Sequence, residues 1–306
     1  MGVSQRQATH KIGHEEGAGM ANTKYGDLVR KLDFRKGSGG ANAREIVFVQ
    51  GADMQGFELN FMLGVYEQTG DWAPGRGAHI HPFDELILFF GYTDDLGYLG
   101  SDMELCLGRE REPHKFGVPT VAVAAKGVPH CPLVTEKVHK PFGHFHLALS
   151  AKYSGSPAPL EGKTDGSKYS HLVKKMPVRK GIGGADAYQV ISMSGADLEG
   201  VNVNYTMGLF NGVGQWEAKR GKKAHVHHYD EAMVFFGLDS SNLSHLGAKL
   251  TVDIGKEHEK HAFDVPTVVA FPKGVPHGPI VCNKVEGAYG VMQVGLGAEY
   301  ASEWVA

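Results

Sequence analysis

Two sets of histidine and glutamate residues recur at matching places in this chain of 306 residues. Each set reads His-x-His-x-x-x-Glu and is followed, some tens of residues later, by Lys-Gly-Val-Pro-His. Imidazole nitrogens together with a carboxylate oxygen form the mixed ligand set that suits iron, manganese, nickel, zinc or copper. We therefore predict two divalent transition-metal ions per chain. The predicted ligands are His79, His81, Glu85 and His130 in the first set, and His225, His227, Glu231 and His277 in the second.

Such a metal would act as a Lewis acid that holds a substrate through one or two oxygens and stabilises an enolate. With iron, nickel or copper, the enolate can react with oxygen, which cleaves a ring or a C–C bond. With manganese or zinc, it can lose carbon dioxide, isomerise or be cleaved by water. A structural metal is one alternative, although structural zinc favours closed, cysteine-rich sites. Ordinary buried polar groups are another, but burying them without a metal or hydrogen bonds costs free energy.

Two arginines precede the ligand sets and are candidate substrate-binding residues. Arg76 lies three residues before His79, and Arg220 lies five residues before His225. A guanidinium group fits planar anions, so either arginine could hold a carboxylate or enolate oxygen beside the metal. A surface arginine at the start of a strand is the alternative interpretation.

Two further histidines are candidate proton carriers. His144 and His146 would share one face of a late strand, because side chains alternate along an extended chain. Their counterparts in the second half are Val291 and Gln293. If this face lines the site, the first set gains two groups that can move protons, and we expect it to be the more catalytic set. Surface or interface histidines are the alternative.

The spacing of the ligands also indicates which elements must position them. The two histidines of each His-x-His motif point the same way only on a strand. The glycine of each Lys-Gly-Val-Pro segment, Gly127 or Gly274, fits a tight turn with positive φ before the fourth ligand. Few segments look helical, and the chain contains 42 glycines. Short strands separated by Gly, Pro and Asp turns predict an all-β barrel or sandwich.

The duplication extends beyond the ligands to whole segments of the chain. Residues 24–29 recur as 168–173, and residues 118–121 recur as 265–268. Residues 153–167 are rich in Gly, Ser and Pro, which is typical of a linker. We predict a first domain at residues 24–152 and a second at residues 168–306. Residues 1–23 match nothing in the second copy, and we expect a terminal arm or, in part, an expression remnant there.

The bulk composition limits the partners of this protein. A net charge of −3 gives no reason to expect nucleic acid or an anionic membrane as a partner. No apolar run approaches the roughly 20 residues that a membrane span needs, and no secretory signal precedes the first repeat. Three cysteines without a Cys-x-x-Cys spacing favour a reducing, cytoplasmic location.

The ligand motifs resemble those of the cupin superfamily, and their duplication resembles that of a bicupin. The first cupin motif, His-x-His followed by Glu and then Gly, is completed here by Gly91 and Gly237. The second motif, Pro-x-Gly-x-x-His, is complete at residues 272–277, whereas Ala125 replaces the proline in the first copy. The resemblance covers most of the chain. It implies two tandem double-stranded β-helix, or jelly-roll, barrels that each bind one metal.

We therefore expect a cytoplasmic bicupin metalloenzyme that acts on a small, metal-chelating, enolisable compound. The candidate substrates are a 1,3-dicarbonyl, a polyphenol and a carboxylate. Bicupins include aromatic-ring and flavonol dioxygenases and oxalate decarboxylases, so the resemblance implies C–C bond cleavage, with a slight preference for a dioxygenase. A non-oxidative lyase or decarboxylase, an isomerase or a C–C hydrolase is the alternative. A metal-containing ligand-binding or sensor protein is the alternative of another class. The resemblance also implies a homodimer that pairs through the outer sheets.

Overall fold

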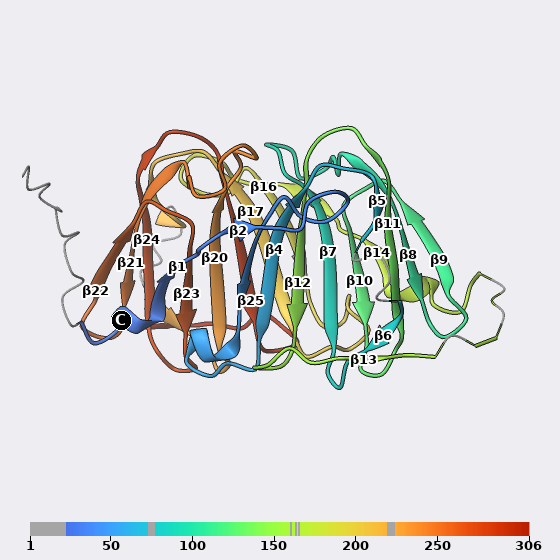
Figure 1. Cartoon of the computed structure of the whole chain (residues 1–306). Coiled ribbons are helices and arrows are strands. Elements are labelled where there is room, and N and C mark those ends of the chain that lie inside the picture. Colours follow the sequence, from blue (N-terminus) through green and yellow to red (C-terminus); the bar gives the residue numbers. More distant parts are fainter. Residues whose placement is uncertain are drawn as a thin grey trace, which may run out of the picture.

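The computed structural model describes residues 23–72, 77–159, 161–162, 164, 166–218 and 224–305. The described chain folds into two β-barrels that lie side by side (Figure 1). The predicted all-β fold with two tandem barrels is confirmed. The arm predicted for residues 1–23 lies outside the described residues, except for Thr23. None of the described helices is long and apolar enough to cross a membrane.

The first barrel is built from two sheets of antiparallel strands. The inner sheet contains, in spatial order, β14 (Val173–Lys175), β10 (Thr120–Ala124), β7 (Glu85–Gly91), β12 (Phe142–Ala148), β4 (Asn60–Tyr66), β3 (Glu45–Val49) and β2 (Arg35–Lys36). The outer sheet contains β13 (Ser156–Pro157), β6 (His79–Ile80), β11 (His130–Val138), β8 (Ser101–Leu107) and β9 (Glu112–Phe116), and β5 (Gly70–Asp71) pairs with β11.

The second barrel repeats this arrangement strand for strand. Its inner sheet contains β1 (Val29–Lys31), β23 (Thr267–Phe271), β20 (Glu231–Gly237), β25 (Tyr289–Gly295), β17 (Asn204–Phe210), β16 (Gln189–Met193) and β15 (Val178–Lys180). Its outer sheet contains β22 (Glu259–Phe263), β21 (Ala248–Ile254), β24 (His277–Val285), β19 (Ala224–Val226) and β26 (Glu303–Val305), and β18 (Gly214–Gln215) pairs with β24. Short 3-10 helices are η1 (Gly26–Leu28), η2 (Gly51–Met54) and η3 (Ser170–Leu172).

The central strands are nearly continuous apolar runs because both of their faces are covered. β7 and β20 each begin with the ligand glutamate, and all seven residues of each strand are buried. Alternate residues face the barrel interior, while the others contact the other barrel. The rings of Phe90 and Phe236 lie 5.9 Å apart across this contact, and Phe145 lies 5.6 Å from Phe236. One apolar core therefore joins the two barrels.

Each repeat contributes its first strand to the inner sheet of the other repeat. β1 pairs with β23, with Val29 opposite Val269, and β14 pairs with β10, with Val173 opposite Ala122. Figure 1 shows the blue strand β1 beside the orange and red strands of the second barrel. The two barrels are therefore linked by exchanged strands as well as by the apolar core. The domain ranges given above stay a prediction.

A buried glutamate of the first barrel holds the segment that leads into β14. The Glu112 side chain is fully buried. Its carboxylate accepts hydrogen bonds from Thr164 Oγ1 at 2.7 Å, from Lys168 N–H at 3.0 Å and from Tyr169 N–H at 3.0 Å. Since an acceptor-only carboxylate satisfies three donors here, Glu112 acts as a clasp between the repeats.

Candidate metal centres

The fourth histidine of each set lies directly across a strand pair from the first. His79 on β6 faces His130 at the start of β11, and His225 on β19 faces His277 at the start of β24. In both pairs the ring centroids lie 4.3 Å apart. Antiparallel pairing thus joins two motifs that are distant in sequence into one cluster.

The glutamate of each set closes its cluster. In the first cluster, Oε2 of Glu85 lies 2.9 Å from Nε2 of His81 and 3.6 Å from Nε2 of His130. The corresponding distances in the second cluster are 2.9 Å and 3.1 Å. Ligand atoms at right angles on an ion with bonds of about 2.1 Å stand about 3 Å apart. The spacings therefore fit neighbouring ligands on one metal ion.

The donor atoms of the second cluster lie closer together than those of the first cluster. The donor atoms of its three histidines and its glutamate all lie within 4.8 Å of one another. In the first cluster, this holds for His81, Glu85 and His130, whereas His79 groups with His130 and Cys131. Both sets predicted from the sequence are thus brought together, and their role as metal ligands enters the function proposed below.

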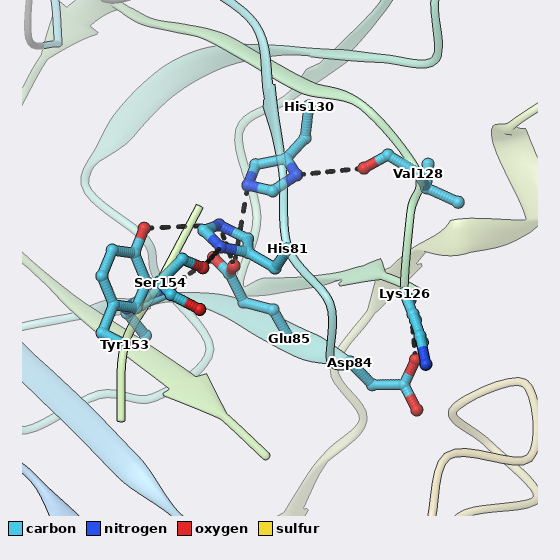
Figure 2. A network of polar contacts seen from close by, with 9 residues as sticks. His81, Asp84, Glu85, Lys126, Val128, His130, Tyr153 and Ser154 are labelled. Carbon is cyan, nitrogen blue, oxygen red and sulfur yellow. Dashed lines mark hydrogen bonds and ion pairs between the residues drawn. The ribbon is translucent and has the colours of Figure 1, made fainter. Parts of the chain in front are cut away.

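Backbone carbonyls determine which ring nitrogen of a histidine faces the cluster. Nδ1 of His81 lies 2.6 Å from the Ser154 oxygen, and Nδ1 of His130 lies 3.3 Å from the Val128 oxygen (Figure 2). The second cluster repeats both contacts, at 2.6 Å and 3.2 Å. Because a carbonyl oxygen only accepts, Nδ1 carries the proton and donates. The Nε2 lone pair is then free for a metal.

Several buried atoms of the clusters have no hydrogen-bond partner within the described part of the chain. They are Oε2 of Glu85, Nε2 of His130, Nε2 of His227, Oε2 of Glu231 and Nε2 of His277. Buried polar atoms cost free energy unless they are satisfied. Neutral imidazole nitrogens and a carboxylate oxygen are what a divalent transition metal binds. The residues present therefore fit a metal ion in each cluster.

The other oxygen of each glutamate binds a side chain of the strand beside it. Nε2 of His146 on β12 contacts Oε1 of Glu85, and the Gln293 amide on β25 donates to Oε1 of Glu231. These matched residues orient the two carboxylates. Burial disfavours the ionised form of Glu85, but His146, His81 and His130 together outweigh burial and hold the pKa of Glu85 well below its ordinary value.

His144 lies deeper in the first barrel and away from the ligand atoms. Its Nδ1 lies 3.0 Å from the Leu88 oxygen, and its ring stacks 5.1 Å from Phe89 and lies edge-on 5.2 Å from Trp72. Burial lowers the pKa of His144 to about 3, so its imidazole is neutral near pH 7. We assign it to packing, and the proton-carrying role suggested by the sequence does not enter the function proposed below.

The turn that carries the fourth histidine is anchored to the strand that carries the glutamate. Oδ1 of Asp84 accepts a hydrogen bond from Lys126 N–H at 2.7 Å (Figure 2), and the matching bond of Asp230 measures 2.8 Å. Gly127 and Gly274 have φ angles of 77° and 76°, so the positive φ predicted for this turn is confirmed. The anchored turn fixes the position of the ligand that follows it.

A tyrosine near each cluster was missed by the sequence analysis. The Tyr153 hydroxyl lies 3.3 Å from Nε2 of His81, and the ring of Tyr300 lies 5.3 Å from that of His227. Tyr153 belongs to the segment that we assigned to the linker. Both tyrosines follow the fourth histidine of their set at the same spacing, and this is the signal that could have revealed them.

Two arginines are predicted from the sequence to bind substrate. Arg76 and Arg220 belong to residues 73–76 and 219–223, which lie outside the described residues. Their role therefore stays a prediction.

A cavity of about 510 Å³ opens onto the second cluster. His225, Glu231 and His277 line it, together with Trp216 and Tyr300. Cavities of this size and mixed lining are typical of small-molecule sites. The cavity favours the second cluster as a substrate site, whereas the sequence favoured the first.

We expect the metal affinity of both clusters to fall as the pH is lowered. Burial opposes the charged form of His81, but the contact with Glu85, its negative charge and the Ser154 carbonyl together outweigh burial and raise the pKa of His81. The same holds for His227 beside Glu231 and the Ala301 carbonyl. A metal binds only the neutral imidazole, so a proton competes with it below the raised pKa. In a titration from about pH 8 to about pH 5, which spans the ordinary histidine pKa of about 6.5, each such histidine should weaken binding by up to roughly tenfold per pH unit once the pH is below its pKa. Competition with a chromophoric chelator measures this, and a constant affinity over the range would contradict it.

No family model and no curated protein matches this chain. Among solved structures, the oxalate decarboxylase of Bacillus subtilis, studied for its Mn(II) centres, shares 8% identity with a TM-score of 0.61. The match covers 90% of this chain and 79% of that chain. A single-residue variant of the same enzyme shares 9% identity over the same portions, with a TM-score of 0.61. A further oxalate decarboxylase structure, concerned with substrate binding, shares 10% identity over those portions, with a TM-score of 0.60. The chain has the bicupin fold: two cupin barrels in tandem, each with its own cluster of histidine and glutamate side chains.

Proposed function

We propose that this protein is a divalent-metal-dependent lyase. It would cleave a C–C bond of a small carboxylate or enolisable oxygen compound without consuming oxygen. The observation that carries the proposal is the second cluster, where four donor groups converge beside a cavity of about 510 Å³. The likeness in fold to oxalate decarboxylase, a metal-containing enzyme, supports a non-oxidative reaction.

The residues around the second cluster prepare it to hold both an ion and a substrate. A bound divalent ion supplies Lewis-acid chemistry, which polarises a chelated carbonyl and stabilises an enolate. Gln293 keeps Glu231 in one orientation by binding its Oε1. The Ala301 oxygen keeps His227 in the tautomer that directs Nε2 inward. Preorganised ligands of this kind need little rearrangement when charge develops on the substrate.

The reaction also needs a proton donor, and we assign Tyr300 to this role. In the decarboxylation of a 3-oxo acid, the bond between the carboxylate carbon and its neighbour breaks and carbon dioxide leaves. The electron pair stays on the neighbouring carbon as an enolate, which then takes up one proton. Burial raises the pKa of Tyr300 to about 12, so its phenol is protonated near pH 7. Tyr300 lines the cavity and is 50% exposed, so water can restore the proton.

A dioxygenase, which the sequence favoured slightly, receives less support than the non-oxidative alternative. The three solved structures named above, which share this fold, are oxalate decarboxylases. The ligand set itself suits several metals and does not select between the two reactions. We therefore propose the non-oxidative lyase reaction.

We expect the metal-loaded protein to release carbon dioxide from a 3-oxo acid at the same rate with and without oxygen. The Tyr300→Phe variant should retain its metal and lose turnover by about 100-fold, because a positioned general acid contributes that much or more. Tyr153→Phe is the matched control at the first cluster and should lose far less. Product NMR under argon and in air measures both effects. Turnover that requires oxygen, or equal losses in the two variants, would argue against the proposal.

A further inference from the structure

The interior faces of the two barrels differ at matched positions beside the clusters. In each barrel, one row of residues crosses four paired strands and passes next to the ligand glutamate. The row reads Phe48, Met62, His146 and Ile87 in the first barrel, and Ser192, Thr206, Gln293 and Met233 in the second. Two large apolar side chains of the first barrel are thus replaced by two small hydroxyl side chains in the second.

In the first barrel, aromatic side chains pack beside the cluster. The rings of Phe48 and Tyr153 meet edge to face at 6.2 Å. The Tyr153 ring in turn lies 4.9 Å from His81 and 5.2 Å from His146, and its hydroxyl lies 3.3 Å from Nε2 of His81. Figure 2 shows Tyr153 lying against His81. Phe48 and Tyr153 therefore fill part of the space beside the first cluster.

At two deeper positions, the second barrel again has a smaller side chain than the first barrel. His144 occupies the first barrel between Phe89 and Trp72, and its counterpart in the second barrel is the smaller Val291. Cys131 follows the fourth ligand of the first set, and its counterpart is Gly278. Both smaller residues, Val291 and Gly278, line the cavity at the second cluster. The cavity is therefore the space that these reductions in side-chain size leave open.

The lining of this cavity indicates the chemistry of its ligand. Ser192, Thr206 and Gln293 offer hydrogen-bonding groups along one row, and Ser192 Oγ lies 3.0 Å from Thr206 Oγ1. Phe210 and Trp216 also line the cavity, and their rings stack at 4.3 Å. An aromatic surface facing a few polar groups is suited to a flat, partly apolar molecule that carries oxygens at one end.

We propose that the second centre selects ligands whose chelating oxygen head group carries an aromatic body, and that the first centre accepts the head group alone. The inference rests on the proposed function in one respect, because it assumes that the head group chelates a bound metal. Pockets of about 300–1,000 Å³ hold drug-sized ligands. The cavity of about 510 Å³ lies in that range, whereas a two-carbon acid would leave most of it filled with water.

Two diketones that share a head group test this proposal by calorimetry on the metal-loaded protein. Acetylacetone offers the head group alone, and 1-phenylbutane-1,3-dione adds one aromatic ring. We expect the phenyl compound to bind at one site per chain. The variant Ser192→Phe with Thr206→Met gives the second barrel the residues of the first. It should weaken binding of the phenyl compound by about tenfold or more through overpacking, and should leave acetylacetone binding nearly unchanged.

The matched control is Phe48→Ser with Met62→Thr, which changes the same positions of the first barrel and should leave the high-affinity phenyl site intact. If the double variant of the second barrel folds poorly, the single variant Thr206→Met replaces it in the experiment. Elemental analysis checks that each variant keeps its metal. Binding of acetylacetone but not of the phenyl compound would overturn the proposal. So would loss of the phenyl site in the first-barrel variant alone. If neither diketone binds the metal-loaded protein, chelation itself fails, and the proposed function falls with the inference.

Discussion

His277→Ala should lower the metal content from about two ions to about one ion per chain, and His130→Ala should do the same at the other cluster. Each histidine lies across the strand pair from the first ligand of its set, with 4.3 Å between the ring centroids. Each is also buried and directs Nε2 at the ligand glutamate, so its removal takes away one of the four donor atoms of its cluster. Because the proposed reaction takes place at the second cluster, His277→Ala should also abolish turnover. Elemental mass spectrometry on protein purified without an affinity-tag metal measures the content.

His139→Ala is the control for removing a histidine as such. Its side chain is 51% exposed and lies outside both clusters, so the variant should keep both ions. A full complement of two ions in either ligand variant would show that the ligand assignment is wrong at that cluster. Full turnover in His277→Ala, together with loss of one ion, would move the reaction to the first cluster.

Glu112→Ala should lower the free energy of unfolding by about 3 kcal/mol or more, because it leaves several donors without their acceptor. The carboxylate binds Thr164 Oγ1 and the backbone N–H groups of Lys168 and Tyr169. These residues lead directly into η3 and β14, the strand that crosses to the first barrel. The substitution should therefore loosen the exchanged strand as well as the local loop. Urea unfolding followed by fluorescence measures the loss of stability.

Glu259→Ala is the matched control on the second barrel. Glu259 holds the backbone N–H groups of Lys24 and Tyr25 at 3.0 Å and 3.1 Å, so it forms the same clasp. Its side chain is 20% exposed, whereas that of Glu112 is fully buried, and water can therefore replace part of the lost contact. We expect a smaller loss than for Glu112→Ala. Equal losses of stability in the two variants would show that burial of the glutamate does not determine how much each clasp stabilises the fold.

The clasps and exchanged strands bear on how the two centres are held. β10 pairs with β7, whose first residue is Glu85, and on its other edge with the exchanged β14. In the second barrel, β23 pairs with β20, whose first residue is Glu231, and with the exchanged β1. Each ligand glutamate therefore starts a strand that lies two strands away from a segment of the other repeat. Removing the clasp of one barrel should therefore disturb the metal centre of that barrel before the centre of the other barrel.

Much of the fold and of the metal clusters could be predicted from the sequence by itself. The spacing of the histidines demands a strand, and the glycines of the two turns need positive φ, because both are constraints on residues close together in the chain. The duplication then showed that each ligand set occurs twice and that the fold consists of two equivalent parts. Comparison of the two copies also marked His144 and His146 as differences between the barrels.

Only the tertiary structure decided what those differences do. His146 contacts the ligand glutamate, whereas His144 packs among aromatic rings, although both share a strand face and lie two residues apart. The strand exchange, the tyrosine beside each cluster and the cavity at the second centre were likewise not predicted. Local periodicity determines which way a side chain points, since it depends on neighbouring dihedral angles. Which side chains share one enclosed volume depends on pairings between strands that are distant in sequence, and on how completely the residues from those strands fill the space between them.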